Sequence, residues 1–102
     1  MQNYKEVLKT EERVWFEIDP EKGKQFLKWA KSIGLVWLNG EEINPRQNVN
    51  FFHFSVSCDG TLTNVPYFVW RDKQFESITK YYFPEFLKGN LISPKDYWSN
   101  KG

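Results

Sequence analysis

The chain of 102 residues is poor in the side chains from which many active sites are built. It has one histidine, His53, and one cysteine, Cys58. A single cysteine excludes an internal disulfide bond, and one cysteine with one histidine cannot supply the ligands of a zinc site. The sequence also has no Gly-rich phosphate loop and no H-E-x-x-H or G-x-S-x-G pattern. It therefore predicts no metal, no cofactor and no catalytic residue of these classes.

The chain also lacks an excess of charge of one sign and a long apolar run. Its 14 Lys and Arg residues nearly balance its 13 Asp and Glu residues, which leaves a net charge of +1. That charge is too small to favour nucleic acid or an anionic membrane as the partner. The longest apolar run, Gly34 to Leu38, is far shorter than the roughly 20 residues of a membrane span, and residues 1–12 lack the apolar core of a signal peptide. We expect a cytoplasmic protein with no membrane contact.

Aromatic side chains are what the chain has in excess. Nine Phe, five Trp and five Tyr residues make up 19% of the sequence. Each such ring buries about 150–250 Å² when it packs, so these residues must form much of the core or of an interface. A chain of this length supports one hydrophobic core without help. We expect a single domain over residues 1–102, with 1–12 and 99–102 loosely attached.

The first half of the chain predicts a strand, a helix and a hairpin. Apolar and polar residues alternate over 13–18, which indicates a half-buried strand. Asp19 and Pro20 are suited to begin a helix over 20–33, and Gly34 is suited to end it. The expected inward stripe of this helix is Phe26, Trp29, Ala30 and Ile33. Leu35–Leu38 is a short strand, and Asn39-Gly40 predicts a type I′ turn before residues 41–43.

The second half predicts a longer hairpin and a second helix. Residues 44–50 form a polar loop, 51–58 a strand, Asp59-Gly60 a turn, and Thr61–Trp70 the returning strand. Since Pro66 has no N–H, the returning strand is either a sheet edge or bulged. A second helix follows Asp72, and a helical turn at 84–88 ends at Gly89. The inward stripe of the second helix is expected to be Phe75, Ile78, Thr79 and Tyr82.

These elements predict an α+β domain in the order β-α-β-β-β-β-α. Its sheet is antiparallel, with about four to five strands and two helices packed on one face. On the strand 51–58, His53 and Cys58 are an odd number of residues apart and so point to opposite faces. Cys58 shares its face with Phe52, Phe54 and Val56 and is expected to be buried, whereas His53 is expected at the surface. The two cannot form a catalytic or metal-binding pair.

The aromatic residues suggest a binding surface on the sheet face away from the helices. If Trp15, Phe51 and Tyr67 lie there, they form a patch suited to protein contact or base stacking. The alternative is that helices cover one face of the sheet and the C-terminal segment covers the rest of these rings. The candidate binding residues are Arg13, Trp15, Phe51, His53, Tyr67 and Arg71.

A family resemblance rests on the run Trp29-Ala30-Lys31-Ser32-Ile33-Gly34-Leu35-Val36-Trp37-Leu38-Asn39-Gly40-Glu41-Glu42-Ile43. In it, a helix ends at glycine, and an aromatic residue is followed shortly by glycine and an acidic residue. With the hairpin residues Asp59–Thr63, it resembles small phage and prophage proteins of Gram-positive bacteria over residues 20–70. The resemblance carries over no functional residue. It implies a mobile-element accessory protein, a class that often acts by binding a host or phage macromolecule.

The sequence therefore favours a non-enzymatic binding module, expected to be homo-oligomeric, that contacts a protein partner. Its contact surface is expected to be the aromatic sheet face or the edge strand Thr61–Trp70. The alternative is a binder of single-stranded nucleic acid or nucleotides, with stacking rings and with Arg13, Arg46 and Arg71 on phosphate. An enzyme that uses the carboxylates of Glu41, Glu42 and Asp59 is not expected, because carboxylates are common at turns.

Overall fold

The computed structural model describes residues 12–47 and 52–101. Residues 1–11, 48–51 and 102 lie outside it, including Phe51 and part of the loop expected over 44–50. In chain order the elements are β1 (Arg13–Glu17), the 3-10 turn η1 (Pro20–Lys22), α2 (Gly23–Ser32), β2 (Val36–Trp37), β3 (His53–Ser57), β4 (Thr61–Asn64), α3 (Tyr67–Trp70), the 3-10 turn η2 (Lys73–Phe75), β5 (Lys80–Tyr82), α4 (Phe83–Phe86) and α5 (Pro94–Lys101).

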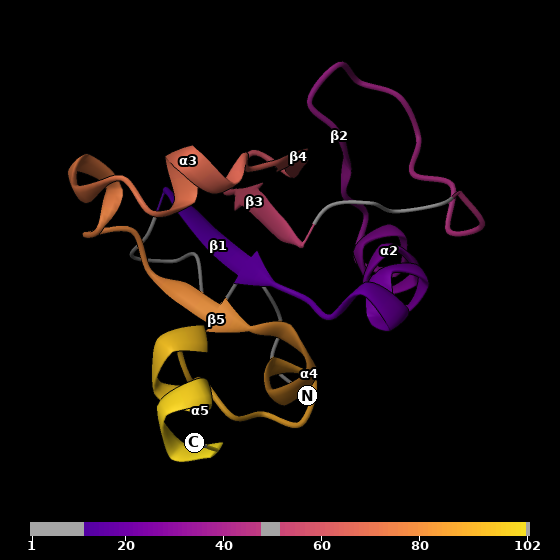
Figure 1. Ribbon diagram of the computed structural model, residues 1–102. Helices are drawn as coiled ribbons and strands as arrows, with labels where there is room; N and C mark the ends of the chain where they lie inside the picture. The colour runs from indigo at the N-terminus through magenta and orange to yellow at the C-terminus, as the bar shows by residue number, and fades with distance from the viewer. Residues whose placement is uncertain (1–11, 48–51, 102) are drawn as a thin grey trace.

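The strands form one mixed sheet in the order β2-β4-β3-β1-β5. The central pairs β1–β3 and β3–β4 are antiparallel, whereas β2 joins β4 and β5 joins β1 in parallel. The predicted purely antiparallel sheet is therefore wrong at both edges. The reason is that α2 connects β1 to β2, and α3 with η2 connects β4 to β5, so that two crossover connections replace hairpins. These connections run in opposite directions over opposite faces, as a common handedness requires (Figure 1).

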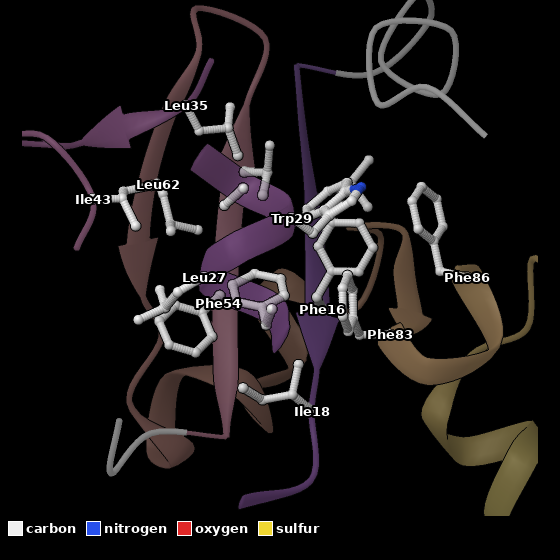
Figure 2. Close-up of a cluster of buried hydrophobic side chains, with 14 residues drawn as sticks. Phe16, Ile18, Leu27, Trp29, Leu35, Ile43, Phe54, Leu62, Phe83 and Phe86 are labelled. Carbon is white, nitrogen blue, oxygen red and sulfur yellow. The ribbon is translucent and has the colours of Figure 1, made fainter. Parts of the chain in front are cut away.

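The alternation of β1 sorts its side chains between the two faces, as predicted. Val14 and Phe16, followed by Ile18, belong to the main core, and Phe16 lies opposite Phe54 of β3. Figure 2 shows this core between the sheet and the helix α2. Fourteen buried residues form it: Val14, Phe16, Ile18, Phe26, Leu27, Trp29, Ala30, Leu35, Ile43, Phe54, Val56, Leu62, Phe83 and Phe86.

The helix predicted over 20–33 is confirmed, except that its first turn is a 3-10 turn. The α-helical part begins at Gly23 and ends at Ser32, and Gly34 follows with a φ of 89°. This left-handed conformation favours glycine and lets the chain leave the helix toward β2. Phe26 and Trp29 are buried as expected, so the inward stripe was read correctly.

Both glycine turns reverse the chain as predicted, but neither is type I′. Gly40 and Gly60 have φ values of 90° and 91°, whereas no residue other than glycine has a positive φ in the described part of the chain. The Gly40 amide donates to Trp37, and the Gly60 amide donates to Ser57, so each turn has three residues with glycine last. The side chains of Asn39 and Asp59 accept hydrogen bonds from amides two residues later, which stabilises this geometry.

The strand predicted over Thr61–Trp70 ends early. Pro66 cannot donate to a ladder, and β4 stops at Asn64, after which Tyr67–Trp70 form the short helix α3. The prediction of an edge strand here is wrong, since β4 lies between β2 and β3. The two edge strands are β2 and β5.

The second helix predicted after Asp72 is also wrong. The Asp72 side chain accepts a hydrogen bond from the Gln74 amide, but the turn that it caps ends at Phe75. The strand β5 follows, with Tyr81 opposite Phe16 of β1. Its side chains alternate, so Tyr81 packs against the main core while Lys80 and Tyr82 face the other side.

The C-terminal segment contains two short helices. The helical turn predicted near 84–88 is α4, and Gly89 follows it with a φ of 87°. Of the residues expected to be loose at the C-terminal end, 99–101 lie in α5, which runs from Pro94 to Lys101 beside β5 (Figure 1), and 102 lies outside the described residues. No helix in the described part of the chain has the length and apolar character needed to span a membrane.

The buried and exposed phenylalanines allow a direct test of this fold. We expect Phe54→Ala to lower the free energy of unfolding by about 3–5 kcal/mol, because Phe54 is fully buried in the main core. Phe68→Ala, at a side chain that is 69% exposed, should change it by less than about 0.5 kcal/mol. Urea denaturation followed by circular dichroism measures both. Equal effects would contradict the assignment of Phe54 to the core.

Candidate functional site

The sheet face opposite α2 carries the candidate site. By alternation, Trp15 and Glu17 of β1 point to this face, together with His53 of β3 and Lys80 and Tyr82 of β5. The segment α3–η2 and the helix α5 lie over it, and rings from both meet the sheet residues. Neither arrangement left open by the sequence is found as stated, because this face is covered jointly by α3–η2 and by α5 of the C-terminal segment.

Trp15 is the centre of a second, smaller core. It is 3% exposed, stacks on Trp70 of α3 with ring centroids 5.5 Å apart, and meets Phe75 at 5.7 Å. The ammonium group of Lys80 lies 5.2 Å from its ring centre. Trp15, predicted to be part of the binding surface, is therefore buried. Its role in this structure is to hold α3 and η2 against the sheet.

Glu17 joins three elements through its carboxylate. Its Oε1 is 3.1 Å from Nε2 of His53, the residue opposite it on β3. Its Oε2 accepts a hydrogen bond of 2.8 Å from the indole Nε1–H of Trp98 on α5. Burial alone would raise the pKa of Glu17, but the hydrogen bonds from His53 and Trp98 overcome it and hold the pKa below its usual 4.5. Glu17 is therefore ionised at neutral pH and attaches α5 to the sheet.

His53 is buried, with 8% of its surface exposed, so the prediction of a surface histidine is wrong. The strand face assigned to it was right, but α3 covers that face: the His53 ring lies 4.2 Å from Trp70 and 5.9 Å from Tyr67. Cys58 is exposed, contrary to the prediction of a buried thiol. It falls outside β3, which ends at Ser57, so the alternation that would bury it no longer applies.

Lys80 and Tyr82 fix the outer part of this face. The Lys80 ammonium donates to the carbonyls of Phe75 and Ile78, each at 3.1 Å. Burial lowers the pKa of Lys80, and the nearby Glu76 carboxylate offsets part of that effect. Tyr82 stacks on Tyr97 of α5 at 4.0 Å and donates a 2.6 Å hydrogen bond to Asp19, and burial followed by this bond raises the pKa of its hydroxyl.

An open pocket of about 770 Å³ lies between α3–η2 and the start of α5. Glu17, Trp70 and Lys80 form its inner part, and Tyr67 and Trp98 stand at its rim, 63% and 51% exposed. The residues that line it are Glu17, Tyr67, Trp70, Arg71, Asp72, Lys73, Glu76, Ile78, Lys80, Ser93, Pro94, Lys95 and Trp98. We take this pocket and its rim as the candidate site.

The structure brings only some of the sequence candidates together here. Tyr67 and Arg71 line the pocket, with the Arg71 guanidinium 5.4 Å from the Tyr67 ring centre. Trp15 and His53 lie beneath it, in contact with Trp70. Arg13 is exposed at the far end of β1 and does not line the pocket, and Phe51 lies outside the described residues.

The sequence reading missed Trp70, Trp98 and Glu17 as site residues. Trp70 was placed on a strand that ends before it, and Trp98 lies in a segment to which no element was assigned. The alternation of β1 did put Glu17 on the same face as Trp15. The shared face with Trp15 could therefore have indicated Glu17 as a site residue. No local sequence pattern could have indicated its hydrogen bond with Trp98, which is far along the chain.

The carboxylates considered for catalysis do not share a site. Glu41 lines a shallow hollow of about 490 Å³ beside Leu38, while Glu42 lines another of about 210 Å³. Asp59 accepts hydrogen bonds from the amide and hydroxyl of Thr61 and so serves its turn. Within the described residues, no three His, Cys, Asp or Glu side chains gather as metal ligands would.

The Glu17 carboxylate should make the stability of the protein depend on pH. Because its pKa is lower in the folded chain, its contribution is complete above about pH 4.5 and is lost as the pH falls through the folded-state pKa. We expect Glu17→Gln to lower the free energy of unfolding by about 1 kcal/mol at neutral pH. The difference from the wild type should shrink in acid, as measured by urea denaturation across the pH range.

Glu21→Gln is the matched control, since Glu21 is an exposed carboxylate of η1. Its effect should be close to zero at every pH. A cost for Glu17→Gln that is the same in acid as at neutral pH would contradict the role of the ionised carboxylate.

The chain was compared with protein-family models, with curated proteins and with solved structures. None of the three comparisons finds a match. The resemblance to small phage and prophage proteins stays a prediction from the sequence. The side chains of the pocket and their geometry therefore carry the functional argument.

Proposed function

We propose that this protein is a non-enzymatic binding module that contacts a partner protein through the open pocket and its aromatic rim. The observation that carries the proposal is the position of three largely exposed rings: Tyr67 and Trp98 at the rim, and Phe68 next to Tyr67 on α3. Large rings exposed beside a hollow are typical of interaction surfaces. Most of the other rings in the described part of the chain are packed in one of the two cores.

The chemistry of the rim also supports a protein partner. Trp, Tyr and Arg are the residue types that most often dominate the binding energy of protein interfaces. Tyr67 and Trp98 are held from below, because Trp98 is hydrogen-bonded to Glu17 and Tyr67 packs against His53. Side chains already held in place lose less conformational entropy on binding, which favours affinity.

The sheet edges are weaker candidates than this rim. The outer side of β2 forms a bridge between Val36 and Glu42, and on β5 the Tyr82 amide already donates to the carbonyl of Ile92. Both edges are short and partly occupied, so an added strand would gain few hydrogen bonds. The partner is a second copy of this chain or another macromolecule of the host, and the rim serves both cases.

Exposed side chains on α3 and at the hollow beside β2 allow a test of which of these two surfaces binds the partner. We expect Tyr67→Ala and Phe68→Ala each to weaken self-association or partner binding by about 1–2 kcal/mol while the fold is kept. Light scattering after size exclusion measures the first, and titration with the purified captured partner measures the second. Leu38→Ala, at a residue that is 67% exposed and lies at the hollow beside β2, is the control.

A monomer that captures no partner would contradict the proposal. Binding that is lost in Leu38→Ala and kept in both α3 variants would also contradict it, because the interface would then lie at the hollow beside β2 and not at the pocket.

The rival function is binding of single-stranded nucleic acid or nucleotides. The stacked pair Arg71 and Tyr67 favours it, because such a pair suits a base and a phosphate. Burial of Trp15 and His53 removes two of the rings proposed for stacking. Titration of labelled oligonucleotides and nucleotides at low salt tests it, and binding that weakens steeply with salt would favour this rival.

A further inference from the structure

We infer that the partner segment that enters this pocket is acidic, with an aspartate or glutamate side chain next to a large apolar one. The inference rests on the proposed function and names the chemistry of the partner. Three observations support it: which charged groups line the pocket, which of them already form hydrogen bonds within the protein, and on which of the two walls of the pocket, α3–η2 or α5, the others lie.

The charged groups that line the pocket divide into held and unheld groups. Lys80 donates to two backbone carbonyls, Glu17 accepts from Trp98 and contacts His53, and Asp72 accepts from the Gln74 amide. These three are fixed by the fold. The remaining groups, Arg71, Lys73, Lys95 and Glu76, are exposed and form no ion pair with a described residue, and we call them unheld; Arg71 lies over the Tyr67 ring, which leaves its charge unpaired.

The unheld charges are mainly positive. The ion pairs between described residues are His53–Glu17 and Lys88–Glu85, so neither Arg71 nor the two lysines pairs with a described carboxylate. Glu76 acts on the Lys80 ammonium and so faces a cation of the inner pocket. With every lining group counted, four cations stand against three carboxylates. A partner with a negative charge is therefore complementary.

The cations stand on both walls, next to the rings. Arg71 and Lys73 belong to α3–η2, beside Tyr67, while Lys95 belongs to α5, one turn before Trp98. A side chain between the walls would meet a ring and a cation on each side. Exposed ion pairs contribute little affinity, so the rings supply most of the binding energy and the cations select the charge of the partner.

An acidic polypeptide fits this arrangement better than a nucleic acid does. The lining includes the carboxylates of Glu17, Asp72 and Glu76, and a chain of closely spaced phosphates would meet them. A polypeptide can place one carboxylate between the walls and keep apolar groups elsewhere. The net charge of +1 for the whole chain also provides little attraction for a phosphate backbone.

Selection from a random displayed peptide library on the immobilised full-length chain tests the inference without assuming a partner sequence. We expect enrichment of peptides in which Asp or Glu is next to Trp, Phe or Leu. One enriched peptide, synthesised with a fluorescent label, then gives dissociation constants by anisotropy for each variant.

Arg71→Glu and Lys95→Glu change one cation on each wall. Each should weaken binding of the enriched peptide by about tenfold and make it less sensitive to salt. Lys28→Glu, at an exposed lysine of α2 on the opposite face, has the same charge change and should alter binding by less than about twofold. Circular dichroism confirms that each variant is folded, and the two walls give independent tests should one variant fail to fold.

Three results would overturn the inference: enrichment of basic or uncharged peptides, no enrichment at all, or unchanged binding in both pocket variants. The proposed function has a separate outcome. Partner binding that needs Tyr67 and Phe68 but not Arg71 or Lys95 would leave the protein-binding module standing and remove only its preference for acidic partners.

Discussion

The packing of Phe16 is the constraint on which the rest of this structure depends. Its ring meets Phe26 and Trp29 of α2, Tyr81 of β5, and Phe83 and Phe86 at α4. Phe16 lies on β1, between β3 and β5, so elements from both ends of the chain pack on one central side chain. Edge-to-face contacts dominate this cluster and specify how the rings are oriented as well as how much area they bury. The crossover helix α2 and the edge strand β5 are fixed by the same residue.

The other face of β1 uses the same alternation for a different purpose. Trp15 holds the segment α3–η2, and Glu17 attaches α5 through Trp98, so both walls of the pocket are attached to neighbouring positions on one strand. This explains how a chain with so many aromatic residues leaves few of them free. Most of the described rings are divided between two cores, and two of the exposed ones, Tyr67 and Trp98, border the pocket formed where the second core is incomplete.

Sequence reasoning succeeded where a local pattern decides the structure. The alternation over 13–18, the amphipathic stripe from Phe26 to Ile33 and the glycine turns each act within a few residues, and each was found. It failed at β5, whose three residues are too short to show a period, and at Tyr67–Trp70, where Pro66 ended a strand that the alternation appeared to continue. Tertiary contacts decide the first place, whereas at the second the missing N–H of Pro66 is a local cause that the alternation concealed. The site followed the same rule: Tyr67 and Arg71 were found, but the link from Glu17 to Trp98 spans 81 residues and has no local signal.

The position of β1 in the sheet has a consequence for synthesis of the chain. β1 is made first, yet its neighbours are β3 and β5, and the partners of Phe16 include Phe83 and Phe86. A nascent chain emerges from the ribosome N-terminal end first, so the packing of Phe16, which can begin with Phe26 and Trp29, is complete only after Phe83 and Phe86 have been translated. Such long-range pairing also slows folding. The incomplete chain carries an apolar central strand with an open edge throughout elongation, and the native sheet closes only after β5 has left the ribosome.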